Sequence, residues 1–224
     1  MYKIIICLFI SAIVLAQNVT DEQGRKQGKW SQNYDNGQLR YTGSFVDNNP
    51  SGIFLYYTKL GILKANLEYF NNGESASARL YHANGKVQAV GLYQNELKEQ
   101  LWKYYDIREK LIRQENYKNG KLEGQTTLFY PNGNVLEKTT YLIDKKEGQS
   151  LQYYRNGKLK LSANYKSDKL EGSYTLYNSA GVKKYSGKYL NDIKDGIWKY
   201  YKDDKSFDYQ IEYINGISQG RQDG

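Results

Sequence analysis

Hydrophobic and polar residues alternate with a period of two along most of the chain. In the segment 159–165, leucine, alanine and tyrosine occupy one face, and lysine, serine and asparagine occupy the other. The segment 39–45 alternates in the same way, so that Tyr41 and Phe45 share a face. Alternation of this kind indicates a half-buried β-strand. No stretch after Ala16 has helical periodicity, and the pattern therefore predicts an all-β protein.

The predicted strands recur with a constant period of 24 residues, without insertions. Two columns of glycine, nine residues apart, account for 13 of the 21 glycines. The first column contains Gly28, Gly52, Gly124, Gly148, Gly172, Gly196 and Gly220, and the second contains Gly37, Gly61, Gly85, Gly133, Gly157 and Gly181. An aromatic column begins at Phe45 and continues with Tyr69, Tyr93, Tyr117, Tyr141, Tyr165, Tyr189 and Tyr213. Such regular spacing indicates a repeat architecture in which each unit packs on its neighbours.

Each unit is predicted to be a β-hairpin. Asn-Gly pairs, such as Asn36-Gly37 and Asn156-Gly157, separate tyrosine-rich runs. Both residue types tolerate the positive φ that tight hairpin turns require. Polar segments such as 191–195 join one unit to the next, and we expect them to be loops of about five residues.

Consecutive hairpins with short connections are expected to pair edge to edge. We therefore predict an elongated antiparallel meander of about eight stacked hairpins that forms an open, twisted sheet. Closure into a barrel or a propeller-like ring is the alternative, because about sixteen strands are enough to close. No segment offers a latch between the first and last units, which favours the open sheet.

Three units depart from the common pattern. The third has Ala76 and Ala78 at conserved-looking column positions, and the fourth has residues 106–109 in place of an Asn-Gly turn. The eighth has residues 203–205 there. We expect altered turn geometry at these places, and we expect local specificity to reside in them, because the regular units repeat one another.

The first sixteen residues resemble a secretory signal peptide. Lys3 supplies a positive charge, an apolar run follows at 4–15, and cleavage is predicted after Ala16. A membrane anchor is disfavoured, because about a dozen apolar residues fall short of the roughly 20 that span a bilayer. Cleavage would remove Cys7 and leave no cysteine. The predicted organisation is 1–16 signal peptide, 17–23 N-terminal segment, 24–220 array of eight repeats and 221–224 tail, in a protein exported to the periplasm, the outer envelope or the exterior.

The chain is basic, with 32 lysines and arginines against 24 acidic residues and a net charge of +8. Export and the lack of a long Lys/Arg block argue against nucleic acid as a partner. An anionic membrane surface or an envelope glycan is one alternative. The favoured interpretation is that lysines cover solvent-facing positions, because acids are interspersed among them, as in 144–147 and 166–169.

Catalytic and metal-binding patterns are not found in the sequence. His82 is the single histidine, and it lacks a recognisable nucleophile and orienting partner, so we expect an exposed residue near a turn. One histidine and no mature cysteine exclude His/Cys metal clusters. The acidic pairs at 21–22 and 203–204 lack the spacing of a calcium loop. We therefore expect a protein that is not an enzyme and has no cofactor or metal.

The aromatic column admits two roles. Tyrosines along one sheet face could stack sugars, peptides or lipid head-groups, which makes Tyr69, Tyr93, Tyr117, Tyr141, Tyr165, Tyr189 and Tyr213 a candidate ligand-binding stripe. Cross-strand aromatic pairs also stabilise a sheet, and a tyrosine ring can pack while its hydroxyl stays solvated. Packing is the favoured role, and the two roles are compatible.

The repeat unit resembles a known family. Its pattern, G-x-W-x-Y-Y-x-x-N-G-x-L, is clearest at 195–201, 123–133 and 29–39. This pattern is similar to the MORN-repeat variant that is found in bacterial proteins described as YwqK-family antitoxins, and the resemblance covers about Gly24 to Gly220. It implies stacked β-hairpins in an elongated sheet that binds or scaffolds varied partners.

Three functions remain open from the sequence. The favoured hypothesis is a non-enzymatic envelope or secreted scaffold that binds a protein partner through its sheet face or an edge strand. The second is binding of anionic lipid or glycan through tyrosines and lysines. The third is inhibition of a neighbouring gene product, as the antitoxin resemblance implies, although export fits poorly with a cytoplasmic toxin.

Overall fold

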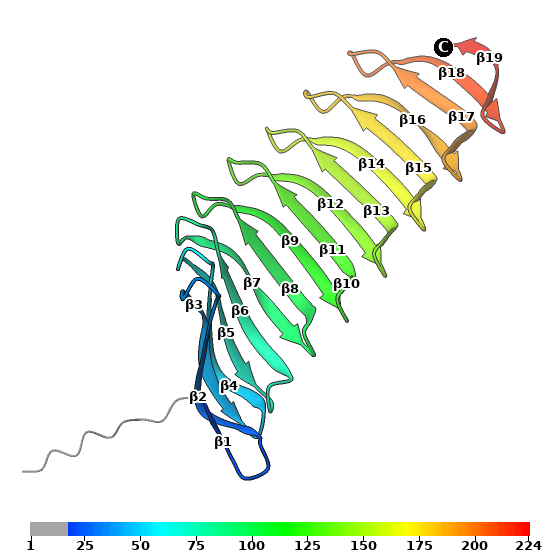
Figure 1. The fold of residues 1–224 in the computed structure, drawn as a ribbon. Helices are drawn as coiled ribbons and strands as arrows, with labels where there is room; N and C mark the ends of the chain where they lie inside the picture. Colours follow the sequence, from blue (N-terminus) through cyan, green and yellow to red (C-terminus); the bar gives the residue numbers. More distant parts are fainter. Residues whose placement is uncertain (1–17) are drawn as a thin grey trace, which may run out of the picture.

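The computed structural model describes residues 18–224, which form one antiparallel sheet of 19 strands (Figure 1). The predicted signal peptide lies outside the described residues. The strands are β1 Val19–Thr20, β2 Lys26–Asn33, β3 Leu39–Val46, β4 Asn49–Tyr57, β5 Leu63–Phe70, β6 Ser75–Tyr81, β7 Val87–Gln94, β8 Leu97–Tyr105, β9 Leu111–Lys118, β10 Lys121–Leu122, β11 Gly124–Phe129, β12 Val135–Leu142, β13 Lys145–Tyr153, β14 Leu159–Lys166, β15 Lys169–Tyr177, β16 Lys183–Leu190, β17 Ile193–Tyr201, β18 Phe207–Ile214 and β19 Ile217–Asp223.

The sheet is an open meander of stacked hairpins, as the sequence predicts. Strands pair with their neighbours in the sequence, except that the short β10 and the longer β11 both pair with β9. Among residues 18–224, β1 pairs only with β2, and β19 pairs only with β18. The two ends therefore do not close into a barrel or ring. The three strands beyond the expected sixteen are β1, the final β19, and β10, which an interruption at Glu123 separates from β11.

The Asn-Gly turns have a geometry that the sequence predicted only in part. Gly37 adopts a φ of 81°, whereas Asn36 is not among the residues of positive φ. The Gly37 N–H donates to the Tyr34 carbonyl at 2.9 Å, and the ladder shifts register nearby, as in a type I turn with a glycine bulge. The Asn36 amide instead donates to the carbonyl of Lys59 in the next unit, at 2.9 Å.

The altered turns of the fourth and eighth units keep this geometry. Glu109 and Lys205 take the glycine position with φ values of 62° and 74°. The Glu109 N–H donates to the Asp106 carbonyl at 2.9 Å, as glycine does elsewhere. The expectation of altered turn geometry is therefore wrong for these two units. The Asp106 and Asp204 carboxylates accept from backbone N–H groups of their own turns, which offsets the strain of a non-glycine residue.

Except before β6, the connections between units are two-residue turns and not the expected five-residue loops. Asn191 and Asp192 have φ values of 50° and 68°, and β17 begins at Ile193. Two consecutive left-handed residues form a type I′ turn, whose twist matches that of the flanking strands. The strands therefore extend almost to the turn.

Acidic residues at these turns bond one unit to the next. The Asp192 carboxylate accepts from the Leu170 N–H at 2.6 Å, and the Glu171 carboxylate accepts from the Asn191 N–H at 2.8 Å. The same bonds recur 24 residues earlier, at Asp168 and Glu147. Part of the acidic charge that the sequence assigns to solvent therefore stabilises the array.

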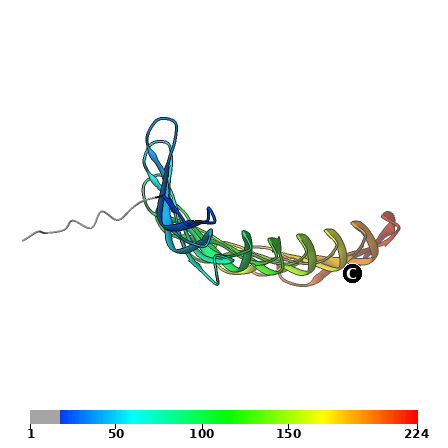
Figure 2. The ribbon, with the colours of Figure 1, turned by 60° about the horizontal axis from the view of Figure 1, so that its bottom comes forward.

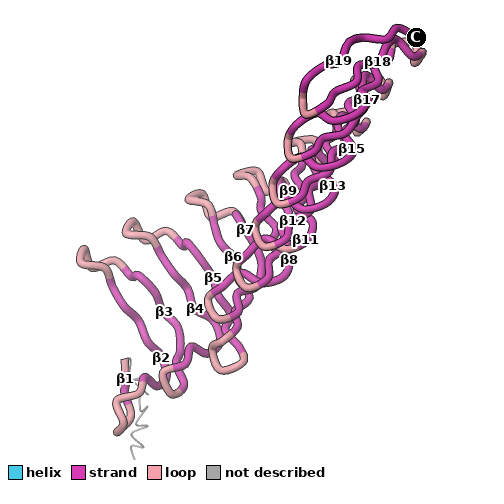
Figure 3. The backbone as a smooth tube through the Cα atoms, turned by 90° about the vertical axis from the view of Figure 1, so that its right-hand side faces the viewer, coloured by secondary structure: helices cyan, strands magenta, loops and turns pink. Residues whose placement is uncertain are grey.

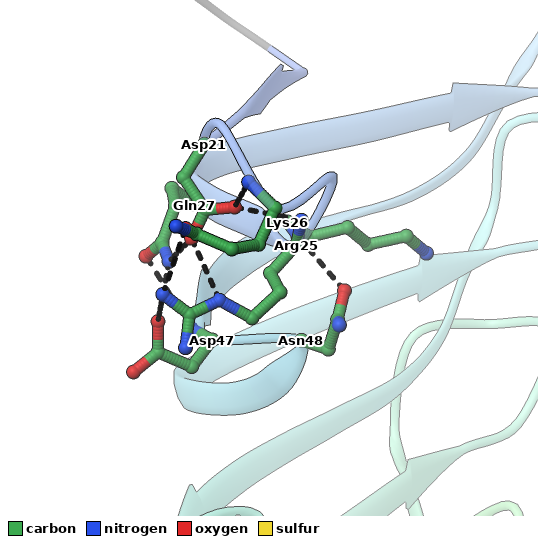
Figure 4. A network of polar contacts seen from close by, with 7 residues as sticks. Asp21, Arg25, Lys26, Gln27, Asp47 and Asn48 are labelled. Atoms are coloured by element: carbon green, nitrogen blue, oxygen red, sulfur yellow. Dashed lines mark hydrogen bonds and ion pairs between the residues drawn. The ribbon is translucent and has the colours of Figure 1, made fainter.

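A polar network also closes the N-terminal end of the sheet (Figure 4). The Asp21 carboxylate accepts from the Arg25 backbone N–H at 2.9 Å and from the Gln27 side chain at 3.0 Å. The Arg25 guanidinium also pairs with Asp47 of the β3–β4 turn at 3.2 Å. Desolvation acts to raise the pKa of Asp21, but these hydrogen bonds outweigh it and lower the pKa below its ordinary value. Asp21 thus links the segment before β2 to the first inter-unit turn.

The core is a single ladder of large and small residues on one face of the sheet. Trp102 and Trp198 are fully buried, and Phe54 is 2% exposed. Each ring lies against a glycine on the preceding strand, and a Cβ at Gly91 or Gly187 would overlap the tryptophan ring. Since residues 18–224 form one sheet and no second layer, rings that lie flat over glycine bury the most apolar surface.

The third unit (residues 72–95) differs from the others in its backbone. Gly52 and Gln100 have positive φ, and a register shift lies beside each. Ala76 is not among the residues of positive φ, and β5 pairs with β6 without a shift. The connection before β6 is correspondingly longer, at 71–74. The ribbon changes direction around β6 and β7, between its N-terminal strands and the regular stretch from β8 onward (Figures 2 and 3). The expectation of altered turn geometry is correct for this unit.

Candidate ligand-binding groove

The seven tyrosines of the candidate stripe are all half-buried on the aromatic face. Tyr69 packs its edge on Phe54 with ring centroids 5.2 Å apart, and Tyr93 packs on Trp102 at 4.9 Å. Tyr189 packs on Trp198 at 5.1 Å. Burial raises the pKa of Tyr93, Tyr141, Tyr165 and Tyr189, and it raises the pKa of Tyr117 to about 12. Tyr69, Tyr93 and Tyr189 therefore pack against the aromatic rings of the core ladder.

Lysines of the same chain lie over the aromatic rings in several units. The Lys98 ammonium is 4.9 Å from both the Trp102 and Tyr117 ring centroids, and it donates to the Tyr104 hydroxyl at 2.6 Å. Burial lowers the pKa of Lys98, although Glu115 acts in the opposite direction. Equivalent contacts join Lys26 to Phe45 at 4.8 Å, Lys146 to Tyr165 at 5.0 Å and Lys194 to Tyr213 at 4.8 Å. An external ligand would have to compete with these lysines.

A groove of about 450 Å³ opens on the aromatic face at the third unit. Its walls are Tyr56, Tyr69, Tyr93, Leu67 and Leu80, and Ala65 and Ala76 also line it. Two of its walls, Tyr69 and Tyr93, belong to the candidate stripe, so the structure brings these two together across β5, β6 and β7.

The small side chain of Ala76 lines the opening, and the unit carries a second alanine, Ala78, that is not part of the lining. Ala78 stands at the ladder position that Trp102 fills in the next unit, and it is 5% exposed. Ala76 lies opposite Tyr69 in the strand ladder, whereas Lys98 lies opposite Tyr93. The register difference thus places a methyl group where the next unit has a long basic side chain. Both alanines are the departures that mark this unit in the sequence.

The polar groups of the groove are two carboxylates and a pair of hydroxyls. The hydroxyls of Tyr56 and Tyr69 are 3.3 Å apart. Burial, then the hydrogen bond to Tyr69, raises the pKa of Tyr56 well above its ordinary value. Glu74 and Glu96 line the groove and are exposed, and Lys64 is the one basic residue in its lining. The groove is therefore aromatic, neutral on its walls and net acidic at its edge.

His82 has a structural position and not the exposed one expected from the sequence. It is half-buried, and its Nε2 lies 2.9 Å from the Tyr105 carbonyl oxygen. Tyr130 and Tyr154, at the same place in other units, donate their hydroxyls to the carbonyl 23 residues later, at 2.9 Å and 2.8 Å. His82 thus takes over an inter-unit hydrogen bond made elsewhere by tyrosine.

Sequence reasoning missed Glu74, Glu96 and Tyr56 as groove residues. Glu74 carried a signal that could have identified it, because it occupies the column of Lys26, Lys98, Lys146 and Lys194. The change of sign at this position marks the third unit as clearly as the two alanines do. Glu96 and Tyr56 come into the groove only through the strand register, which the sequence does not show.

Among residues 18–224 there is neither a group of three metal-ligand side chains nor a helix long and apolar enough to cross a membrane. The fold defines a protein of stacked β-hairpin repeats. Four segments, 26–47, 76–95, 122–142 and 146–167, match the family model described as MORN repeat variant. The chain therefore contains MORN-variant repeats, which confirms this part of the family resemblance of its sequence. No curated protein matches the chain.

Proposed function

We propose that the protein is a non-enzymatic scaffold, exported through its apolar N-terminus, that binds a protein partner on the aromatic face of its sheet. The observation that carries this proposal is the groove at the third unit. At the same ladder position, aromatic rings stand in five other units and small polar residues stand at Thr126 and Ser150, while lysines cover several of the rings of this face. A concave, mostly apolar site with a few polar groups is typical of recognition sites.

The placement of the lysines favours a protein partner over an anionic surface. Lys98 and Lys194 point their ammonium groups at rings of their own chain. Their charges are therefore partly used within the fold, and the groove itself carries Glu74 and Glu96. Such a surface would repel an anionic membrane locally. Pairing with the exposed edge strand β19 is the alternative mode that an experiment should separate from face binding.

Site-specific photo-crosslinking in the native envelope tests the proposal. A photoreactive residue at Glu74 would sit beside the groove, and one at Glu68 would lie on the opposite face, because side chains alternate along a strand. A third at Gln219 would report on edge pairing. We expect one identified protein adduct from position 74 and none from position 68. An adduct confined to position 219, or equal adducts at 74 and 68, would contradict binding at the aromatic face.

A further inference from the structure

We propose that the groove of the third unit binds an alkylammonium group, which is the chemistry of a lysine side chain. This inference rests on the proposed function and deepens it, because it names the group of the partner that the groove recognises. It is carried by an internal comparison. In four units the chain supplies an ammonium to its own aromatic rings, and the groove at the third unit offers aromatic rings without one.

The internal precedent is found in four units. In each, a lysine near the start of the unit places its Nζ between 4.8 and 5.0 Å from the aromatic ring 19 residues later. These distances lie within the range of favourable cation–π contacts. The aromatic face of this protein is thus a surface on which lysine ammonium groups are repeatedly bound.

The groove at the third unit has the aromatic rings of this arrangement but no ammonium group. Within residues 18–224, the rings of Tyr56, Tyr69 and Tyr93 have no lysine or arginine head group in cation–π contact, although such contacts are made by fourteen other cation–ring pairs. Lys98 lies opposite Tyr93 in the ladder, yet its ammonium is directed to Trp102 and Tyr117. Glu74 precedes Lys98 by one 24-residue period in the sequence, but in the strand ladder Ala76 opposite Tyr69 takes the place of Lys98 opposite Tyr93.

The space and the charges of the groove fit a cationic chain. About 450 Å³ is available where Ala76 takes the ladder place of a lysine, which exceeds the volume that a butylammonium chain needs. The hydroxyl oxygens of Tyr56 and Tyr69 can accept from an ammonium, which has three donors. Glu74 and Glu96 supply opposite charge at the edge. Lys64 is exposed and leaves the groove with a net negative charge.

Titration of the mature chain, residues 17–224, with n-butylammonium tests the inference, and the ring signals of Tyr56, Tyr69 and Tyr93 provide the NMR readout. Neutral n-butanol, of nearly the same size, is the matched ligand control. We expect saturable binding with a Kd of about 1–10 mM, in keeping with five non-hydrogen atoms, and much weaker binding of n-butanol. Nα-acetyl-lysine methylamide should bind at least as well if the natural ligand is a lysine side chain, and more weakly than butylammonium if it is a free amine.

Three variants make the test specific. Glu74→Gln and Glu96→Gln should each weaken butylammonium binding about two- to fivefold, as expected for an exposed ion pair. Glu68→Gln removes the same charge on the opposite face and should leave the Kd unchanged. Ala76→Lys should place an internal ammonium in the groove and abolish binding, and unchanged amide spectra outside the third unit would show that this variant is folded.

Several results would overturn the inference. One is equal affinity for n-butanol and n-butylammonium. Another is an unchanged Kd for n-butylammonium in Glu74→Gln, and a third is a change of the Kd in Glu68→Gln as large as that in Glu74→Gln. A protein adduct from position 74 together with no ammonium binding would leave the proposed function standing and remove this inference. Ammonium binding without any protein adduct would leave this inference standing, remove the proposed function and indicate a free amine as the ligand.

Discussion

The third and fourth units are neighbours with the same period but different surfaces. In the fourth, Trp102 fills the ladder at 0% exposure, and Lys98 lies over it. In the third, Ala78 stands at the tryptophan position, Ala76 takes the ladder place of the lysine, and a groove opens beside Glu74. The difference shows how a repeat array can acquire a local site. One unit has small side chains where its neighbour has large ones, and the neighbouring units hold its backbone in place.

The largest loss of stability is expected when the buried ring of the fourth unit is removed. Trp102→Ala removes a fully buried ring and should lower the free energy of unfolding by about 3–5 kcal/mol. Urea unfolding and hydrogen exchange of β7, β8 and β9 would measure it. Trp30→Ala is the matched control at a half-buried ring, and its cost should be clearly smaller. Equal costs would contradict the assignment of the core to the buried ladder.

Filling the glycine beneath that ring should cost less. Gly91→Ala places a methyl group where it overlaps the Trp102 ring and should destabilise by about 1–3 kcal/mol. The same change made in the Trp102→Ala background should cost little, because the ring is gone. A double-mutant cycle measures this coupling, and additive costs would show that the glycine and the ring do not constrain each other.

Removing the internal ammonium should have a moderate effect. Lys98→Met keeps the apolar chain but loses the contacts to Trp102, Tyr104 and Tyr117. We expect a loss of about 0.5–2 kcal/mol, measured by urea unfolding. Lys103→Met, in the same strand but on the opposite face, serves as the control. An unchanged or raised stability of the Lys98 variant would mean that the ammonium contributes nothing to the filled unit.

The inter-unit bond of His82 should contribute about 0.5–1.5 kcal/mol. His82→Ala loses the contact to the Tyr105 carbonyl and should be destabilised by that amount. His82→Tyr introduces the residue used at the same place in other units and should restore the stability. If both variants unfolded at the same urea concentration, the bond would have no role in joining the two units.

The smallest expected effect is the dependence of stability on pH at the Asp106 turn. Hydrogen bonds from the backbone of Lys110 and Arg108 lower the pKa of Asp106. A depressed folded-state pKa contributes stability above the unfolded-state value, and this stability is lost as the pH falls through the folded-state pKa. Asp106→Asn should keep the turn, as Asn178 does, and remove this pH dependence. Carbon-detected NMR titration would check it, and an unshifted Asp106 carboxyl would contradict it.

The sequence predicts the architecture well because period-two alternation and a 24-residue spacing depend on local chemistry alone. It does not predict the turns correctly, because the left-handed conformations of Ile143 and Asp144 are held by bonds from adjacent units, such as the one from the Leu122 N–H to Asp144. The groove was only half predictable. Ala76 and Ala78 mark the unit, but the register that brings Tyr56 and Glu96 into one groove with Ala76 is a property of the paired strands β4 to β7.

The central claim is that the third unit binds the ammonium that other units supply internally. A crystal structure of the mature chain soaked with n-butylammonium tests it most directly. We predict a ligand with its nitrogen within about 6 Å of the Tyr93 ring and beside Glu74, and no ligand at the lysine-covered rings of Trp102 or Trp198. A vacant groove at saturating ligand, or equal occupancy at the lysine-covered rings, would contradict the account.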